Sequence, residues 1–270
     1  MALKTCFLPK GKIVSENLHK VRLVDLVFPD QTNHQGNMFG GAALAFMDKV
    51  AFLAAARLAR RGFVTAAVER MDFKKPVYEG EIVDLVGEVR SVGRSSMNVR
   101  VSLWAENLLT GERRLTTQGD FIMVATDRKT NTTPLPPVPD YALEPANVTR
   151  TNELVFPGDT DHRGLLFGGR ALNLMEKAAF VAASRHARTS VVMAALKEID
   201  FAASIHVGEM IEVSARVASV GRSSMRVAVQ LCAEDLQTGV RRQATIGEFI
   251  MVALGEDGKP TPAPSLKKED

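Results

Sequence analysis

Cysteine is scarce in this chain, which has only Cys6 and Cys232 among its 270 residues. Neither residue belongs to a Cys-x-x-Cys motif or to a cluster of cysteines and histidines. Two isolated thiols exclude a disulfide framework and argue against a structural zinc site. The sequence therefore predicts a protein of a reducing compartment that binds no metal.

The sequence also has no large excess of charge of one sign and no long uninterrupted apolar run. The 34 Lys and Arg residues nearly balance the 31 Asp and Glu residues, which argues against nucleic-acid binding. The first ten residues lack the apolar core of a secretory signal. The most apolar stretch, 41–59, contains Asp48, Lys49 and Arg57 and is unsuited to span a membrane. We expect a soluble, cytoplasmic protein that binds neither nucleic acid nor membranes.

The sequence does contain an internal duplication with an offset of 128 residues. The segment LVFPDQTNHQGNMFGG at 26–41 returns as LVFPGDTDHRGLLFGG at 154–169, and the segment SVGRSSM at 91–97 returns unchanged at 219–225. A period this long indicates two copies of one domain. We expect domains at 18–127 and 148–255, a proline-rich linker at 128–147 and a flexible tail at 256–270.

Each copy shows the same order of predicted elements. In copy one, a short strand and a Gly-punctuated loop precede a helix at about 41–60, which is apolar nearly all round and should be buried. Segments with strand-like alternation follow at 64–73, 81–91, 97–106 and 113–125. The pattern predicts an α+β fold in which an antiparallel sheet wraps a central helix, with the two copies paired as an intramolecular pseudo-dimer.

An acid lies within each apolar helix, Asp48 in copy one and Glu176 in copy two. The neighbours of Asp48 one turn away are Leu44 and Phe52. Desolvation in such surroundings would raise the pKa of the carboxyl group and make it available as a base or a nucleophile. The alternative is a solvated acid paired with the lysine that follows it.

A polar loop leads into each helix and ends in a Gly-Gly pair, which begins with Gly40 in copy one and Gly168 in copy two. Backbone N–H groups of a first helical turn can bind an oxyanion, although such glycines can also serve backbone conformation or packing alone. Asn33 can orient a water or a carbonyl group, and Asp161 takes its place in copy two. The loop histidines are candidate general acids or plain loop residues: His34 and His162.

A Gly-Arg-Ser-Ser turn occurs at 93–96 and again at 221–224. A guanidinium followed by two hydroxyls suits the recognition of a phosphate or an amide, whereas the alternative is an ordinary hairpin turn with an exposed arginine. The turn is not a P-loop, and no Gly-x-Gly-x-x-Gly precedes a helix. Nucleotide hydrolysis and dinucleotide binding are therefore unsupported.

Taken together, these motifs resemble those of the hotdog-fold acyl-CoA thioesterases. The resemblance covers about 20–127 and 148–255, and the tandem copies are similar to the double-hotdog acyl-CoA hydrolases of that family. The matching residues in copy one are Phe28-Pro29, Asn33, Gly36-Asn37, Phe39-Gly40-Gly41, Met47-Asp48, Met71-Asp72-Phe73, Lys75-Pro76 and the turn at 92–96.

The resemblance implies hydrolysis of acyl-CoA to a fatty acid and CoA, with no cofactor, because the thiolate leaves readily. It also implies composite sites, in which the loop and Gly amide of one copy face the helix acid of the other. The two sites would be Asn33 and Gly40 facing Glu176, and Asp161 and Gly168 facing Asp48.

The family usually has Asn in the loop and Asp on the helix, so each composite site holds one expected residue and one substitute. The Asn33/Glu176 site fits a mechanism with a single base, and we expect it to be the active one. In the other site, repulsion between Asp161 and Asp48 would favour one of them being protonated.

The resemblance further implies that basic and hydroxyl side chains bind the CoA phosphates and that the chain forms a homotrimer. The expected phosphate-binding residues are Arg94, Ser95, Ser96, Lys75, Arg222, Ser223 and Ser224. The neighbouring Lys74 would contribute in copy one only, because copy two has Ala202-Ala203 at the equivalent positions. The alternatives are a hotdog dehydratase or hydratase, in which His34 or His162 pairs with an acid, and a non-catalytic acyl-CoA-binding module.

Overall fold

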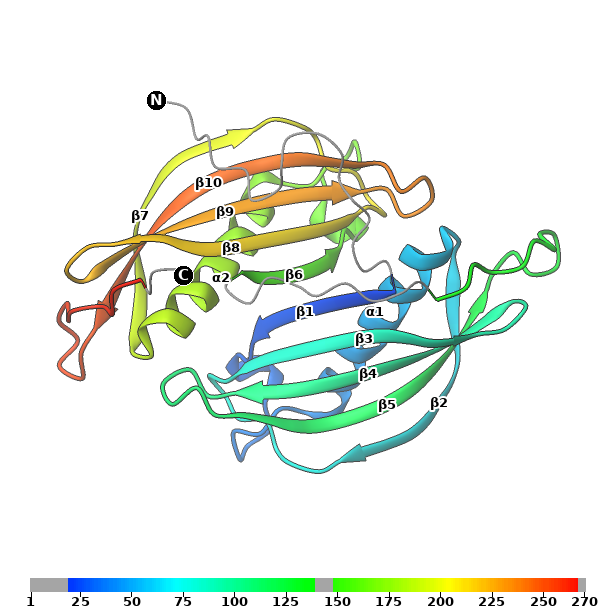
Figure 1. Ribbon diagram of the computed structural model, residues 1–270, viewed down its shortest axis with the longest axis horizontal. Coiled ribbons are helices and arrows are strands. Elements are labelled where there is room, and N and C mark those ends of the chain that lie inside the picture. The colour runs from blue at the N-terminus through cyan, green and yellow to red at the C-terminus, as the bar shows by residue number, and fades with distance from the viewer. Residues whose placement is uncertain (1–18, 139–147, 267–270) are drawn as a thin grey trace.

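The computed structural model describes residues 19–138 and 148–266 and shows two similar halves, each with one sheet and one long helix (Figure 1). Copy one consists of β1 (Lys20–Leu26), a 3-10 helix (Pro29–Gln31), α1 (Gly40–Ala59), β2 (Phe63–Phe73), β3 (Ile82–Val92), β4 (Ser96–Glu106) and β5 (Arg113–Ala125). Copy two consists of β6 (Thr149–Leu154), a 3-10 helix (Pro157–Asp159), α2 (Gly168–Ala187), β7 (Ser190–Phe201), β8 (Met210–Val220), β9 (Ser224–Glu234) and β10 (Arg241–Leu254).

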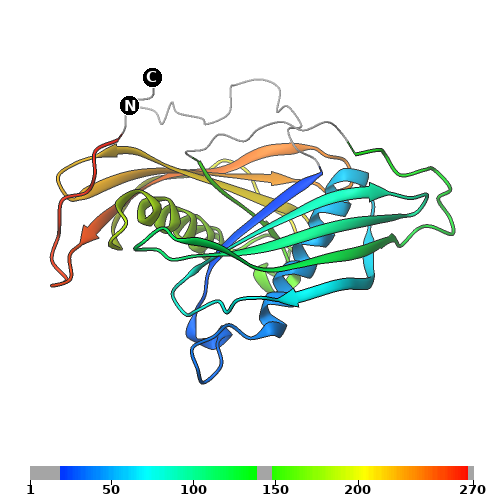
Figure 2. The same cartoon turned by 60° about the horizontal axis from the view of Figure 1, so that its bottom comes forward.

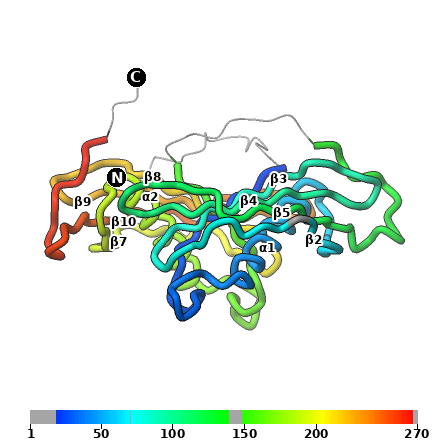
Figure 3. The backbone as a smooth tube through the Cα atoms, turned by 90° about the horizontal axis from the view of Figure 1, so that it is seen from below, coloured from blue at the N-terminus to red at the C-terminus, as the bar shows by residue number. Residues whose placement is uncertain are grey.

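Both sheets are antiparallel and have the same strand order, β1-β3-β4-β5-β2 in copy one and β6-β8-β9-β10-β7 in copy two. The strands β1 and β6 lie side by side in the middle of the molecule, so β2 and β7 form its outer edges (Figure 1). The two helices lie on the same, concave side of the sheets, and the loops that precede them project from that side (Figures 2 and 3). The predicted α+β architecture with two wrapped helices is confirmed.

The helix α1 packs closely on its sheet because small residues let the two backbones approach. A Cβ atom at Gly87 of β3 would lie 2.5 Å from Val50 Cγ1, so only glycine fits there. Met47, Val50 and Leu53 are fully buried against the sheet. The helix is not buried all round, however, because Leu44 remains 39% exposed in its first half.

A reciprocal set of ion pairs joins the two copies. At the end of α1, Arg57 and Arg60 contact Glu234 of β9 at 3.1 and 2.7 Å. Arg60 has a left-handed backbone with a φ of 58°, which costs about 1–2 kcal/mol for a residue with a Cβ. Its ion pair across the copy interface offsets that strain. The equivalent residues of the other copy repeat the arrangement in reverse: Arg185 and Arg188 contact Glu106 of β4 at 2.7 and 2.9 Å.

Asp84 is the most buried acid in this interface, with no exposed side-chain surface. Burial alone would raise the pKa of its carboxyl group, but hydrogen bonds and ion pairs with three arginines lower the pKa below the usual value. Arg22 binds Asp84 at 2.7 and 2.5 Å, and Arg113 and Arg185 lie at 3.2 and 3.3 Å. Because Arg185 belongs to copy two, Asp84 also links the copies.

Part of the predicted flexible tail has a defined structure. The amide of Thr261 donates to the carbonyl oxygen of Ala253 at 2.9 Å, and that of Ala263 donates to Arg222 at 2.9 Å. His186 Nε2 lies 2.6 Å from the carbonyl oxygen of Pro264. The tail is therefore joined to copy two by these contacts within 256–266, its flexibility stays a prediction, and 267–270 lie outside the described residues.

The start of the predicted linker is held against copy one. Arg61 binds the carboxylate of Asp127 at 2.5 Å and the carbonyl oxygens of Asn131 and Thr133 at 3.3 and 3.0 Å. Residues 131–138 contain no helix or strand, and 139–147 lie outside the described residues.

No helix within 19–138 or 148–266 has both the length and the apolar character needed to cross a membrane.

Candidate functional site

The first turn of α1 is open to a ligand. Helix α1 begins at Gly40, and neither Gly40 nor Gly41 has a left-handed backbone. A Cβ atom at Gly41 would meet nothing within 4 Å, and one at Gly40 would make an ordinary contact of 3.6 Å with Phe73. Neither conformation nor packing within the chain therefore requires these glycines, and a first turn without side chains can admit a ligand close to its N–H groups. The equivalent pair at Gly168 and Gly169 has the same surroundings.

Asn33 organises the loop before α1. Its side-chain oxygen accepts hydrogen bonds from the backbone amides of Gln35 and Asn37 at 2.9 and 3.1 Å. The oxygen is therefore engaged by the loop, and the amide NH₂ is the end that offers protons to a ligand. An asparagine in this geometry can hold a water or a carbonyl oxygen.

Asp161 holds the copy-two loop in the same way but has different chemistry. It accepts backbone hydrogen bonds from Leu165 at 3.0 Å and Arg163 at 2.8 Å, and the Arg163 side chain lies 3.1 Å from its second oxygen. These bonds, led by that from Leu165, lower the pKa of Asp161. The lowered pKa favours the ionised form of Asp161, and the protonation of one acid of the pair stays a prediction. An ionised carboxylate only accepts hydrogen bonds.

Asp48 is exposed on α1 and accepts a hydrogen bond from the hydroxyl of Thr65 on β2. Sequence reasoning missed Thr65, because nothing in strand alternation shows which strand residue lies opposite a helix. The duplication offers the one available signal: its equivalent in copy two is Met193, which has no hydroxyl group. The two helix acids therefore differ in the side chain opposite them as well as in their own side-chain length.

Glu176 is half-buried on α2. Burial raises the pKa of its carboxyl group, and the charge of Lys177 only partly opposes the change. The predicted upward shift is confirmed for this acid. A raised pKa suits a residue that must take a proton from water near neutral pH.

The lysines that follow the two helix acids bind the other copy instead. Lys49 lies 2.8 Å from Glu153 on β6, and Lys177 lies 2.7 Å from Asp25 on β1. The alternative in which each acid pairs with the next lysine is therefore wrong. Lys49 also lies 5.9 Å from the centre of the Phe156 ring, at the entry to the copy-two loop.

These contacts define which side of α1 carries the acid. Lys49 and Arg57 reach copy two, whereas Asp48 bonds to Thr65 on β2, the outer edge of its own sheet. Asp48 therefore contacts the outer strand of its own sheet, while the adjacent Lys49 reaches copy two. Among the described residues, no hydrogen bond or ion pair joins the members of a predicted composite site within one chain, neither Asn33 with Glu176 nor Asp161 with Asp48.

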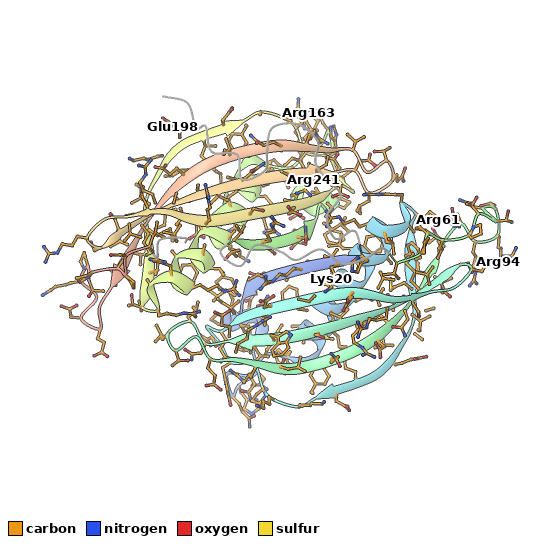
Figure 4. All side chains as sticks on the ribbon, in the orientation of Figure 1. Lys20, Arg61, Arg94, Arg163, Glu198 and Arg241 are labelled. Atoms are coloured by element: carbon orange, nitrogen blue, oxygen red, sulfur yellow. The ribbon has the colours of Figure 1, made fainter. Side chains whose placement is uncertain are left out.

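The predicted phosphate-binding turns lie near the C-terminal ends of the helices, away from the glycine pairs at the first turns. Gly93 donates to the carbonyl oxygen of Ser96 at 2.8 Å, and Ser95 accepts from Ala125, whose strand partner Phe63 follows the end of α1. Figure 4 shows Arg94 exposed at the tip of this hairpin, far from the centre of the molecule. The equivalent turn contains Arg222, Ser223 and Ser224, and the carbonyl oxygens of its first two residues accept hydrogen bonds from Ala263 and Ala253.

Lys74 and Lys75 lie nearer the helix start. Both are exposed and follow Phe73, whose ring lies against Gly40. They therefore place positive charge beside the first turn of α1, in copy one only. That Lys75 and the two turns bind CoA stays a prediction. The described residues contain no group of three or more His, Cys, Asp or Glu residues placed to hold a metal ion.

Comparisons with known proteins give consistent matches over both copies. The model of the Thioesterase superfamily matches residues 35–112 and 163–240. A cytosolic acyl coenzyme A thioester hydrolase of Mus musculus is 26% identical over 299 residues, which cover 93% of this chain and 78% of that protein. An uncharacterized acyl-CoA thioester hydrolase of Bacillus subtilis is 37% identical over 150 residues, covering 54% of this chain and 86% of that protein.

Among solved structures, an acyl-CoA hydrolase of Agrobacterium tumefaciens is 42% identical and superposes with a TM-score of 0.82. The superposition covers 90% of this chain and 97% of that chain. The likeness therefore extends over both copies.

Proposed function

Because this chain belongs to the thioesterase superfamily, we propose that it hydrolyses acyl-CoA thioesters to a free fatty acid and CoA. Relatives named as acyl-CoA hydrolases over most of both chains support this reaction. The observation that carries it is the half-buried Glu176, whose raised pKa suits a base in a fold whose helices begin with open glycines.

In the proposed mechanism, Glu176 takes a proton from the water that attacks the thioester carbonyl. The Asn33 amide orients the reactants, and the N–H group of Gly40 stabilises the oxyanion at the start of α1. The alternative role for Glu176 is that of a nucleophile that forms an anhydride with the acyl group. The thiolate is a good leaving group, so the residues named suffice for the reaction.

We assign the activity to the Asn33/Glu176 site in preference to the Asp161/Asp48 site. Asn33 has protons to donate, whereas the lowered pKa of Asp161 keeps it ionised and paired with Arg163. A second carboxylate beside Asp48 would repel the electron-rich oxyanion. Lys75 adds positive charge near Gly40, and Arg94 supplies a further exposed cation for the CoA phosphates.

We further propose that the chain is cytoplasmic, acts in fatty acid metabolism and assembles as a homotrimer of about 88 kDa, three times 29.4 kDa. Light scattering tests the assembly, and a stable mass of one chain would contradict it.

Release of free thiol from a panel of acyl-CoAs of different chain lengths, followed with a thiol-reactive dye, tests the reaction. We expect release from at least one member. Binding without release would favour an acyl-CoA-binding module, and a change in the acyl chain without release would favour a hydratase. Either result would contradict the proposed hydrolysis.

A further inference from the structure

The outer face of the copy-two sheet is more deeply buried than that of copy one. This face lies opposite α2 and is turned toward the viewer in Figure 1. A row of cross-strand neighbours on β8, β9 and β10 runs over it, and Ser214, Gln230 and Ile246 are 8%, 2% and 7% exposed. The adjacent residues along these strands belong to the core under α2, so alternation places the row on the outer face. The equivalent row of copy one is only half-buried: Val86, Ser102 and Gln118.

The elements within 19–138 and 148–266 do not account for this difference. The two copies contain the same elements in the same order, and each helix packs on the inner face of its own sheet. The end of α1 reaches the copy-two sheet at Glu212 and Glu234, and α2 reaches the equivalent residues of copy one. The tail binds at Arg222 and Ala253, near the end of α2. Equivalent elements would bury the two outer faces alike, so the additional burial comes from a segment outside these ranges.

The side chains of the copy-two face also suit a cover. Ala228 stands where copy one has Arg100, and Ile246 stands where copy one has a glutamine. Both changes remove a polar group that would be costly to bury. Cys232, which is 4% exposed, stands where copy one has Trp104. Smaller side chains at two of these three positions leave room for a chain segment above the sheet.

We propose that residues 1–18 of this chain lie across the outer face of copy two and cover the row at Ser214, Gln230 and Ile246. Two other segments lie outside the described residues, but 267–270 are four residues long and 139–147 must connect the linker with β6. Residues 1–18 form the longest segment, and they contain apolar pairs at 7–8 and 13–14. An extended segment also brings main-chain donors and acceptors to the buried polar side chains beneath it.

The position of β1 allows the segment to reach this face. The amides of Val24 and Arg22 donate to the side chains of Thr151 and Asn152 at 2.9 and 3.3 Å, so β1 runs beside β6. Neighbouring strands lie about 4.8 Å apart, and the path from β1 over β6, β8 and β9 to β10 is about 20 Å long. About six extended residues span that distance. The pair at 13–14 therefore lies over the row, and the inference does not depend on the proposed hydrolysis.

The reactivity of Cys232 tests the cover. In a Cys6→Ser protein, Cys232 is the one remaining thiol, and its rate of labelling by a thiol-reactive dye reports its accessibility. Ile13→Asp and Val14→Asp are then added together, because successive side chains of an extended segment alternate and one of the pair faces the sheet. We expect Cys232 to be labelled at least about tenfold faster in the added presence of the two aspartates.

The matched control places the thiol on the outer face of copy one. It carries Ser102→Cys with both natural cysteines replaced by serine, and the two aspartates should leave its labelling rate unchanged. An unchanged rate at Cys232 would overturn the cover, and so would equal acceleration at both positions, since this would indicate a loosened fold. Labelling of Cys232 that slows as the protein concentration rises would assign the cover to a second copy and would also overturn the proposal.

Disulfide trapping locates the segment even if the aspartate variant fails to fold. Ile13→Cys, Val14→Cys and Ser15→Cys are made singly in the Cys6→Ser protein and treated with a mild oxidant. We expect at least one of them to form a disulfide with Cys232 within the same chain.

The control for trapping replaces Cys232 by serine and offers Ser102→Cys in its place. Ser102 lies on β4, the second strand from β1, whereas Cys232 lies on β9, the third strand from β1 on the other side. A segment without a fixed place would therefore reach position 102 at least as readily as position 232. Trapping at position 102 as efficient as at Cys232, or none at Cys232, would overturn the proposal.

Discussion

Replacement of Gly41 by alanine tests whether this glycine is needed for substrate binding but not for folding. The backbone at Gly41 is not left-handed, and the added Cβ would meet nothing within 4 Å. Alanine is preferred to glycine inside helices by about 0.5–1 kcal/mol. The variant should therefore be as stable as the wild type or slightly more so, with a Tm higher by up to about 2–4 °C.

Activity should change in the opposite direction. If the thioester oxygen lies against the first turn of α1, the methyl group of Gly41→Ala displaces it. A misplacement of about 1 Å can cost on the order of a hundredfold in rate. We expect kcat/KM for thiol release to fall by about that factor while the melting curve shows an intact fold.

Gly169→Ala is the matched control, because a Cβ there also meets nothing within 4 Å. It should keep nearly full activity if the Asn33/Glu176 site does the work. Equal losses in both variants would mean that both sites turn over. A Gly41→Ala protein with full activity and normal stability would refute the assignment of this helix start to the substrate.

Three further predictions concern acids. Glu176→Gln should lower kcat for thiol release by at least about a hundredfold, and Asp48→Asn far less; the reverse ranking would move the activity to the other site. Because the pKa of Glu176 is raised and the base must be ionised, kcat/KM should fall with decreasing pH around a midpoint above the usual value for glutamate, and a midpoint at or below that value would contradict this role. Asp84→Asn should destabilise the protein by about 3–5 kcal/mol in denaturant titrations, because it leaves Arg22 and Arg185 without their buried partner. Since folding lowers the pKa of Asp84, its contribution should be complete above the pKa of an unfolded aspartate and be lost as the pH falls through the lowered value; unchanged stability of the variant at neutral pH would count against this.

Much of the fold could be predicted because its signals are local. Apolar periodicity predicted the helix at 41–60, and it lies at Gly40–Ala59. Alternation and turn residues located the strands of copy one to within about two residues. The upward pKa shift of Glu176 could be predicted too, since it follows from apolar neighbours on the same helix.

The direction in which the site residues face could not be predicted. The pairing of β2 with β5 shifts register between Thr65 and Ala67 and again between Glu69 and Asp72. Each shift changes which side chains point toward the helix, and alternation in the sequence does not reveal it. The contact between Thr65 and Asp48 therefore emerged only in three dimensions. The contacts of the tail with Ala253 and Arg222 could not be predicted either, because these hydrogen bonds use main-chain atoms, which leave no signature in the sequence.

The reciprocal ion pairs between the copies have the form of an isologous interface, in which each half offers the other the same groups. Such an interface is built by two identical chains, so it fits an ancestor that was a dimer of single domains. In that dimer, one mutation of the gene changed the same residue in both domains. Fusion into one chain removed this constraint, because Thr65 could be kept while Met193 took its place in the other half. The linker thus made the two halves separately mutable, and one site could change its chemistry without the loss of the other.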